Sequence, residues 1–177
     1  MRIIAGKYRG KKLKEFELSS TKPTLDRVKE SIFNLIQFDV VNAIVLDLFS
    51  GTGALGIEAI SRGANHTVLV DNNPKAIKLI EENLKGLDGS FKVENTDSIE
   101  YLKNTQLTFD IVLIDPPYKT DLGLIAIDFL VKNNKINDNG IIIFETSEDN
   151  NFKFDFVGYS VVKKKYGTVA VYKISKD

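Results

Sequence analysis

A carboxylate, two prolines and an aromatic ring follow one of the apolar stretches of this sequence. Residues Phe109–Ile114 have the apolar character of a buried strand, and Asp115, Pro116, Pro117 and Tyr118 come directly after it. Proline has no backbone N–H, so this turn offers acceptors: the Asp115 carboxylate and the Pro116 carbonyl. Acceptors alone suit a planar NH₂ group, and the Tyr118 ring offers a face for base stacking. Taken by itself, a pair of prolines more commonly means a rigid turn.

A glycine-rich loop follows another strand-like stretch, residues 43–49. Gly51, Gly53 and Gly56 match G-x-G-x-x-G, a pattern that lets the backbone approach a nucleotide at the start of a helix. Asp71 ends the next apolar stretch, 18 residues after Gly53, where a carboxylate can bind ribose hydroxyls. The pattern is weak alone, but its context of strand, turn and helix is the one that nucleotide-binding folds use.

Asp47, at the entry to this loop, distinguishes between two classes of cofactor. A dinucleotide places its pyrophosphate on N–H groups at a helix start, and a nearby carboxylate repels it. S-adenosylmethionine carries an ammonium and a sulfonium and no phosphate, so Asp47 favours S-adenosylmethionine. Asp97 follows the stretch 91–95 and is predicted either to contact the adenine amino group or to cap a helix. The expected cofactor-binding residues are Asp47, Phe49, Gly51, Gly53, Asp71, Asn72, Asp97 and Ser98.

Together, the turn and the loop indicate methyl transfer to an amine. Hydrogen bonds from the two amine N–H groups to Asp115 and a carbonyl direct the nitrogen lone pair toward a sulfonium methyl. No strong base is needed before attack, because the nitrogen loses its proton once it is cationic. Methylation at C5 of a pyrimidine would need a cysteine nucleophile, and the sequence has no cysteine. No metal is expected either. The expected catalytic residues are Asp115, Pro116, Pro117 and Tyr118.

Strand-like and helical stretches alternate from residue 43 onward. The strands are predicted at 43–49, 66–71, 91–95, 109–115 and 140–146, and the helices at 54–62, 74–85, 97–103 and 121–134. Such alternation predicts a parallel sheet with helices on both faces. Two last strands, 156–166 and 168–174, are separated by Gly167 and predict an antiparallel edge hairpin. The expected fold is α/β: a doubly wound, mostly parallel seven-stranded sheet with the Rossmann-like layout of class I methyltransferases.

The first 14 residues are strongly basic, although the chain of 177 residues has a net charge of zero. They contain six lysines and arginines and no acidic residue, so the remaining chain has a net charge of −6. This arm predicts an anionic partner such as nucleic acid; a solvated terminus is the alternative. Residues 1–20 are predicted to form a hairpin arm and 21–40 a helix, with a core over 41–177 in a single domain.

Composition places the chain among globular proteins. Hydrophobic residues make up 43% and charged residues 27%. No apolar run approaches the roughly 20 residues that cross a membrane, and the first residues lack the apolar region of a signal peptide. The absence of cysteine excludes a disulfide framework and a thiolate zinc site. A cytoplasmic protein with no membrane partner is predicted.

Four stretches together resemble the RsmD family of methyltransferases: MRIIAGKYRGKKL, TKPTLDRVKESIFNLI, VLDLFSGTGALGIEAISRGA and KKKYGTVAVYKI. The resemblance covers nearly the whole chain. It implies methylation of the N2 amine of a guanine in 16S ribosomal RNA, at position 966 in standard rRNA numbering. The implied partner is 16S rRNA, naked or within the assembling small subunit. The expected RNA-binding residues are Arg2, Lys7, Tyr8, Arg9, Lys11, Lys12, Lys22, Thr24 and Arg27.

This sequence departs from the family pattern at two positions. Lys22 stands where the family has an arginine, which keeps the charge but loses the bidentate fork. Thr168 follows Tyr166-Gly167 where the family commonly has aspartate. The lysine run 163–165 is predicted either to contact RNA or to protect an edge strand from aggregation.

Two other functions are compatible with parts of the sequence. A DNA amino-methyltransferase acting on adenine N6 or cytosine N4 shares the turn and the loop. A sequence-specific DNA reader usually needs an added recognition domain, for which 177 residues leave no room. A non-catalytic RNA-binding module would explain the basic arm but not a cofactor loop that faces the Asp115 turn.

Overall fold

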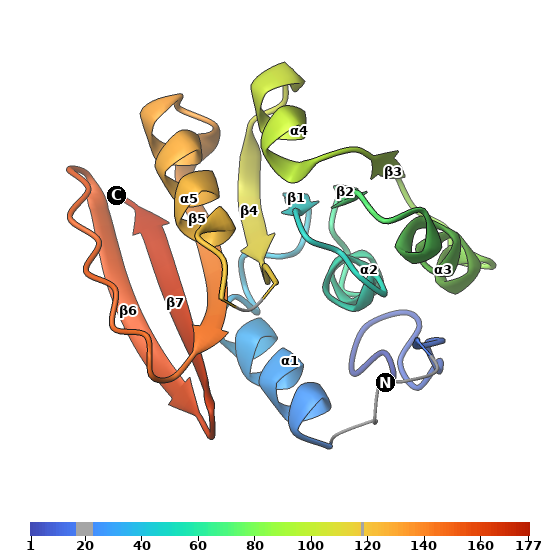
Figure 1. The fold of residues 1–177 in the computed structure, drawn as a ribbon. Coiled ribbons are helices and arrows are strands. Elements are labelled where there is room, and N and C mark those ends of the chain that lie inside the picture. Colours follow the sequence, from blue (N-terminus) through green and yellow to red (C-terminus); the bar gives the residue numbers. More distant parts are fainter. Residues whose placement is uncertain (17–22, 118) are drawn as a thin grey trace.

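The computed structural model describes residues 1–16, 23–117 and 119–177, and residues 23–25 by their backbone alone. Within these ranges the chain forms five helices and one sheet of seven strands (Figure 1). Two residues with predicted roles, Lys22 and Tyr118, lie outside the described residues, and so does the side chain of Thr24.

The sheet has the strand order β3-β2-β1-β4-β5-β7-β6. The first five strands in this order pair in parallel, and β7 is antiparallel to both β5 and β6. This confirms the predicted mostly parallel sheet with an antiparallel C-terminal hairpin at its edge. The strands are β1 (Ile44–Asp47), β2 (His66–Asp71), β3 (Phe91–Asn95), β4 (Phe109–Ile114), β5 (Ile136–Ser147), β6 (Tyr159–Tyr166) and β7 (Val169–Lys176).

Strand β5 begins four residues earlier than predicted. Ile136 pairs with Phe109, and the register then shifts before Ile141 pairs with Ile111. The polar residues Asn137, Asp138 and Asn139 lie in this irregular part, and Asn139 has a φ of 61°. Because these residues carry no apolar alternation, the periodicity of the sequence misses the start of the strand.

Helices cover both faces of the sheet. Side chains alternate along each strand, so Val45, Ile111 and Ile143 pack in one cluster with α1. Leu46 and Val112, from the opposite face, pack in another cluster with α4 and α5. None of the helices within the described ranges is long and apolar enough to cross a membrane. The helices are α1 (Pro23–Leu35), α2 (Ala54–Ser61), α3 (Pro74–Leu84), α4 (Ser98–Asn104) and α5 (Leu122–Lys132).

The basic arm is packed onto the body beside α2 and α3. The arm forms a hairpin with one bridge, between Arg2 and Lys12. Ile3 is 0% exposed and Leu13 is 6% exposed, and both belong to a core cluster with residues of α2 and α3. A Cβ atom at Gly6 would lie 1.8 Å from the carbonyl oxygen of Ser61, so only glycine permits this approach. The alternative of a solvated terminus is therefore wrong for the arm backbone.

Candidate active site

Three acidic side chains gather at the carboxyl ends of the adjacent strands β1, β4 and β5. Asp47 ends β1, Asp115 follows the last residue of β4, and Glu145 lies near the end of β5. Ile114 is paired with Phe144, which places Asp115 and Glu145 at neighbouring positions. Ligands of open α/β sheets bind at this edge, and in Figure 1 β4 and β5 point toward the side where α1 and the arm lie.

A cavity of about 530 Å³ lies at this edge. The acids Asp47, Asp71, Asp97, Asp115 and Glu145 all line it. The structure therefore brings together most of the predicted site residues. Those that line the cavity are Asp47, Phe49, Gly51, Asp71, Asn72, Asp97, Ser98, Asp115, Pro116 and Pro117, whereas Gly53 is buried and is not part of the lining.

Two carboxylates hold the glycine loop in place. Asp47 Oδ2 accepts a hydrogen bond of 2.8 Å from the N–H of Gly56. A Cβ at Gly56 would lie 2.8 Å from the Leu69 side chain, so the first turn of α2 packs closely on β2. Asp71 accepts from the N–H groups of Gly51 and Asn73, each at 2.8 Å. The Asp71 carboxylate thus fixes the loop in addition to the ribose contact predicted for it.

The start of α4 forms the adjacent wall. Asp97 is the N-cap of α4, and its Oδ1 accepts from the N–H groups of Ile99 and Glu100 at 2.9 and 3.0 Å. The Ser98 hydroxyl donates to the carbonyl of Leu48 at 2.7 Å. The capping interpretation of Asp97 is therefore confirmed. Its position in the cavity wall leaves the adenine contact a prediction.

Burial raises the pKa of three of these carboxyls, which makes them weaker acids than usual. It raises the pKa of Asp47 to about 7, and the Gly56 N–H opposes this rise while the charges of Asp115 and Asp71 add to it. Burial also raises the pKa of Asp115 to about 6. The pKa of Glu145 rises to about 8, first through burial and then through the charge of Asp115.

These carboxyls fit a cationic ligand. Asp47 is 1% exposed, and its Oδ1 has no hydrogen-bond partner among the described residues. A buried acceptor without a partner costs free energy, which a ligand cation or N–H donor would recover. An ammonium and a sulfonium meet this need, whereas a phosphate would be repelled by the same acids. The residues present therefore fit S-adenosylmethionine.

Several lining residues were not predicted from the sequence. Glu145 lies within a stretch that was identified only as a strand. Lys29 and Val28 come from α1, and Met1 and Phe16 from the two ends of the arm. The sequence marks Glu145 only as an acid near the end of an apolar strand. Acids are common at strand ends, so this feature does not identify a site residue. The other four depend on how α1 and the arm pack.

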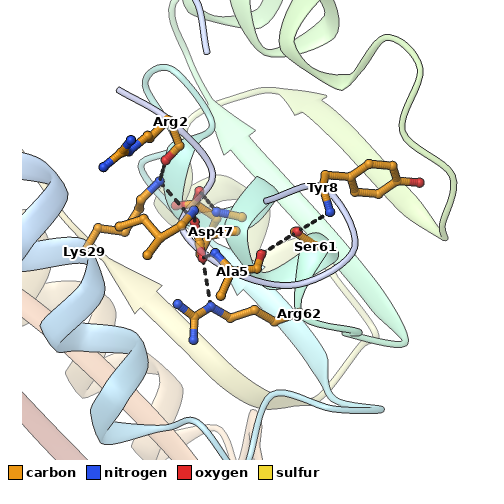
Figure 2. A network of polar contacts seen from close by, with 10 residues as sticks. Arg2, Ala5, Tyr8, Lys29, Asp47, Ser61 and Arg62 are labelled. Carbon is orange, nitrogen blue, oxygen red and sulfur yellow. Dashed lines mark hydrogen bonds and ion pairs between the residues drawn. The ribbon is translucent and has the colours of Figure 1, made fainter. Parts of the chain in front are cut away.

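A buried polar network attaches the arm and α1 to α2. Glu58 of α2 is 0% exposed and accepts from the N–H groups of Ile4 and Ala5 at 2.9 and 3.0 Å. It also pairs with Lys29 at 3.1 Å and Arg62 at 2.8 Å. Lys29 further donates to the carbonyl of Arg2 (Figure 2). The same lysine lines the cavity, so this Glu58 network joins the arm to the wall of the site.

The predicted RNA-binding residues fall into two groups. In the first, side chains contact the body: Lys7 pairs with Asp88 at 2.9 Å, and Lys11 donates to the carbonyl of Lys85. The Tyr8 hydroxyl accepts from the N–H of Asp88 at 2.7 Å. In the second group the side chains are exposed: Arg2, Arg9, Lys12 and Arg27. Arg2, Arg9 and Arg27 line one surface groove together with Asp26 and Glu30.

The lysine run occupies the edge strand β6. Lys163 donates to the carbonyl of Asn150 at 2.8 Å and lies over the ring of Tyr172. Lys164 and Lys165 are exposed. Lys165 pairs with Ala170, which pairs with Thr146 at the carboxyl end of β5. The lysines therefore give this outermost strand the charge that protects it from pairing with other chains. They also extend to the carboxyl end of the sheet, where the cavity lies.

Comparisons with known proteins identify the family of this chain. A family described as "Conserved hypothetical protein 95" matches residues 1–175. "Ribosomal RNA small subunit methyltransferase D" of Haemophilus influenzae is 37% identical, over 84% of this chain and 80% of the relative. The protein of that name from Escherichia coli K12 is 31% identical, over 98% of this chain and 88% of the relative.

A solved structure has the same fold over nearly its whole length. It is described as "Putative methyltransferase yhhF from Escherichia coli", with a TM-score of 0.90 and 31% identity over 100% of this chain and 98% of that one. The family match spans nearly every residue, and the acidic cavity fits the cofactor of such enzymes. This chain therefore belongs to the RsmD family of S-adenosylmethionine-dependent methyltransferases.

Proposed function

We propose that this protein transfers the methyl group of S-adenosylmethionine to the exocyclic N2 amine of a guanine in 16S ribosomal RNA, the residue at position 966 in standard rRNA numbering. One observation carries the proposal: the turn formed by Asp115, Pro116 and Pro117 opens into the same cavity as Asp47 and the glycine loop. A group that accepts N–H donors thus lies beside a site for a sulfonium.

The residues of the turn would act on the amine. Asp115 and the Pro116 carbonyl accept its two N–H groups and direct the nitrogen lone pair into the cavity. Bound S-adenosylmethionine would supply an electrophilic methyl group and would leave as the neutral thioether. Asp115 would then accept the proton that the methylated nitrogen loses. Tyr118, outside the described residues, is proposed to stack on the guanine.

The names of the relatives support ribosomal RNA as the substrate. The two relatives from Haemophilus influenzae and Escherichia coli are both named for the small ribosomal subunit. The exposed arginines Arg2, Arg9 and Arg27 line one groove beside the arm and α1. A groove of this kind suits phosphates, and the lysines of β6 would extend the contact along the same edge of the sheet.

Replacing Arg9 and Arg27 with alanine should weaken RNA binding and flatten its dependence on salt. Each phosphate contact contributes about 0.7 to 0.9 to the slope of log K against log salt concentration, so the double variant should lose about 1.5. Titration of labelled rRNA at several salt concentrations measures the slope. The matched control replaces Lys7 and Lys14, which already pair with Asp88 and Glu82. Equal losses in both double variants would contradict the proposed phosphate contacts.

The affinity for S-adenosylmethionine should rise with pH between about 5.5 and 7.5. The pKa of Asp47 is raised to about 7, so this carboxyl is largely protonated at the acid end of this range. A cation stabilises its ionised form, and cation binding therefore releases protons. We expect the affinity to increase about tenfold or more over this pH range, because a single carboxyl with a pKa near 7 becomes ionised.

Calorimetry in two buffers of different ionisation enthalpy measures the protons released. 5′-Methylthioadenosine is the matched ligand, because it keeps the adenosine and lacks both positive charges. Its affinity should be nearly independent of pH. Proton uptake on binding of S-adenosylmethionine, or the same pH profile for both ligands, would contradict a role for the Asp47 carboxyl in binding the cation.

Transfer of a labelled methyl group tests the function directly. Unmodified small ribosomal subunits, naked 16S rRNA, duplex DNA and a release factor would each be incubated with the protein and labelled S-adenosylmethionine, and the product would be digested and identified. N2-methylguanosine from either RNA supports the proposal, and the better RNA shows at which stage of assembly the enzyme acts. Label in DNA or protein with none in RNA would overturn it.

A further inference from the structure

The proposed reaction assigns no role to Glu145, although it lies beside the residue that holds the amine. Glu145 is 7% exposed and lines the same cavity as Asp115 and Pro116. Ile114 is the last residue of β4 that pairs with β5, and its partner is Phe144, so the residues that follow, Asp115 and Glu145, occupy adjacent positions. Burying a second carboxyl here costs free energy, so its presence calls for a function.

The orientation of Glu145 follows from its neighbours on β5. Phe144 packs in the cluster with α4 and α5, and Ile143 packs in the cluster with α1. Because side chains alternate along a strand, Glu145 faces the same side as Ile143. Asp47 faces this side as well, since Val45 belongs to the α1 cluster. The two carboxyls thus border the cavity next to the proposed position of the amine.

The edge of guanine matches a carboxyl that keeps its proton. Its N2 amine, N1–H and O6 follow one another along one edge, as donor, donor and acceptor. A neutral carboxyl has one O–H donor and one carbonyl acceptor, which match O6 and N1–H as a pair. Burial and the charge of Asp115 raise the pKa of Glu145 to about 8, so this form prevails at neutral pH. Adenine offers an acceptor at N1 and cannot form the same pair.

We propose that the Glu145 carboxyl recognises guanine by accepting a hydrogen bond from N1–H and donating one to O6, while Asp115 and Pro116 hold the N2 amine. This inference rests on the proposed function and adds the group that selects guanine. Glu145 is a specificity residue: it contacts the base but takes no part in breaking or forming the bonds of the methyl transfer.

Replacement of the target guanine by 2-aminopurine tests the pairing. This base keeps the N2 amine, lacks O6 and has an acceptor at N1. Single-turnover methylation of the two RNAs would be compared for the wild type, Glu145→Ala, Glu145→Gln and the control Glu148→Ala, whose acid follows β5 outside the cavity lining. Glutamine presents the same donor and acceptor as a neutral carboxyl. Melting temperatures of all four proteins check that they fold.

The wild type should methylate guanine about 10 to 100 times faster than 2-aminopurine. This ratio is the discrimination that one good bidentate contact provides between a correct and an incorrect base. Glu145→Ala should bring this ratio close to one, whereas Glu145→Gln and Glu148→Ala should retain it. A ratio unchanged in Glu145→Ala, or lost equally in Glu145→Gln, overturns this inference and leaves the proposed function standing. Label from the wild type on an atom other than guanine N2 overturns both.

Discussion

Replacing Asp115 with alanine is expected to reduce methyl transfer by at least about 10²- to 10³-fold, the range seen when one preorganised polar contact to a reacting group is removed. The carboxylate is the side-chain acceptor that the turn offers to the amine, and both prolines lack an N–H to replace it. The affinity for S-adenosylmethionine should stay within a few-fold, because Asp47 and Asp71 hold the glycine loop without Asp115. Single-turnover transfer and calorimetry measure the two quantities separately.

Asp121→Ala is the matched control for this variant. Asp121 is an exposed acid that follows the same turn, and its side chain makes no cap hydrogen bond to the described backbone of α5. Its replacement should leave both transfer and cofactor affinity unchanged. A parallel loss of cofactor affinity and transfer in Asp115→Ala would mean that Asp115 belongs to the cofactor site rather than to the site of the amine.

Replacing Glu58 with alanine is expected to destabilise the protein by about 3 to 5 kcal/mol, the usual cost of removing one partner of a buried ion pair. Lys29, which is 3% exposed, would lose its carboxylate, and the N–H groups of Ile4 and Ala5 would lose their acceptor. For a chain of this size the melting temperature should fall by about 10 °C. Thermal unfolding followed by circular dichroism measures it.

Glu82→Ala provides the comparison for Glu58→Ala. Glu82 pairs with Lys14 on the surface, where solvent screens the charges, so its removal should not change the melting temperature measurably. Because Met1 and Phe16 of the arm line the cavity, Glu58→Ala should also weaken cofactor binding at temperatures where the protein is folded. A melting temperature equal to that of the wild type would show that the Glu58 network contributes little to holding the arm.

The charge of the arm illustrates how packing changes a pattern read from composition. Six basic residues without an acid indicate an anionic partner, yet Lys7 and Lys14 find acids of the same chain. The body bears the excess of acidic residues that this pairing requires. Arg9 and Arg27 therefore remain the better candidates for contact with RNA, and their proximity in one groove depends on the packing of the arm against α1.

The sequence by itself determined the alternation of strands and helices, the glycine loop and the turn after β4. These features depend on local order along the chain: side chains alternate with a period of two in strands, and a proline removes its own N–H wherever it stands. The carboxyl ends of parallel strands meet at one edge. Asp47, Asp71 and Asp115 could therefore be assigned to one site before the strand order was known.

Only the tertiary structure decided the positions of Glu145 and of the Glu58–Lys29 pair. Glu145 is separated from Asp115 by 30 residues, and the two become neighbours because β5 pairs with β4 in one register. Glu58 and Lys29 each resemble an ordinary charged residue of a helix, and their burial results from the packing of α1 and the arm on α2. The pKa values near 6, 7 and 8 follow from the same burial. Desolvation and pairing depend on which distant segments meet, and periodicity along the chain carries no information about that.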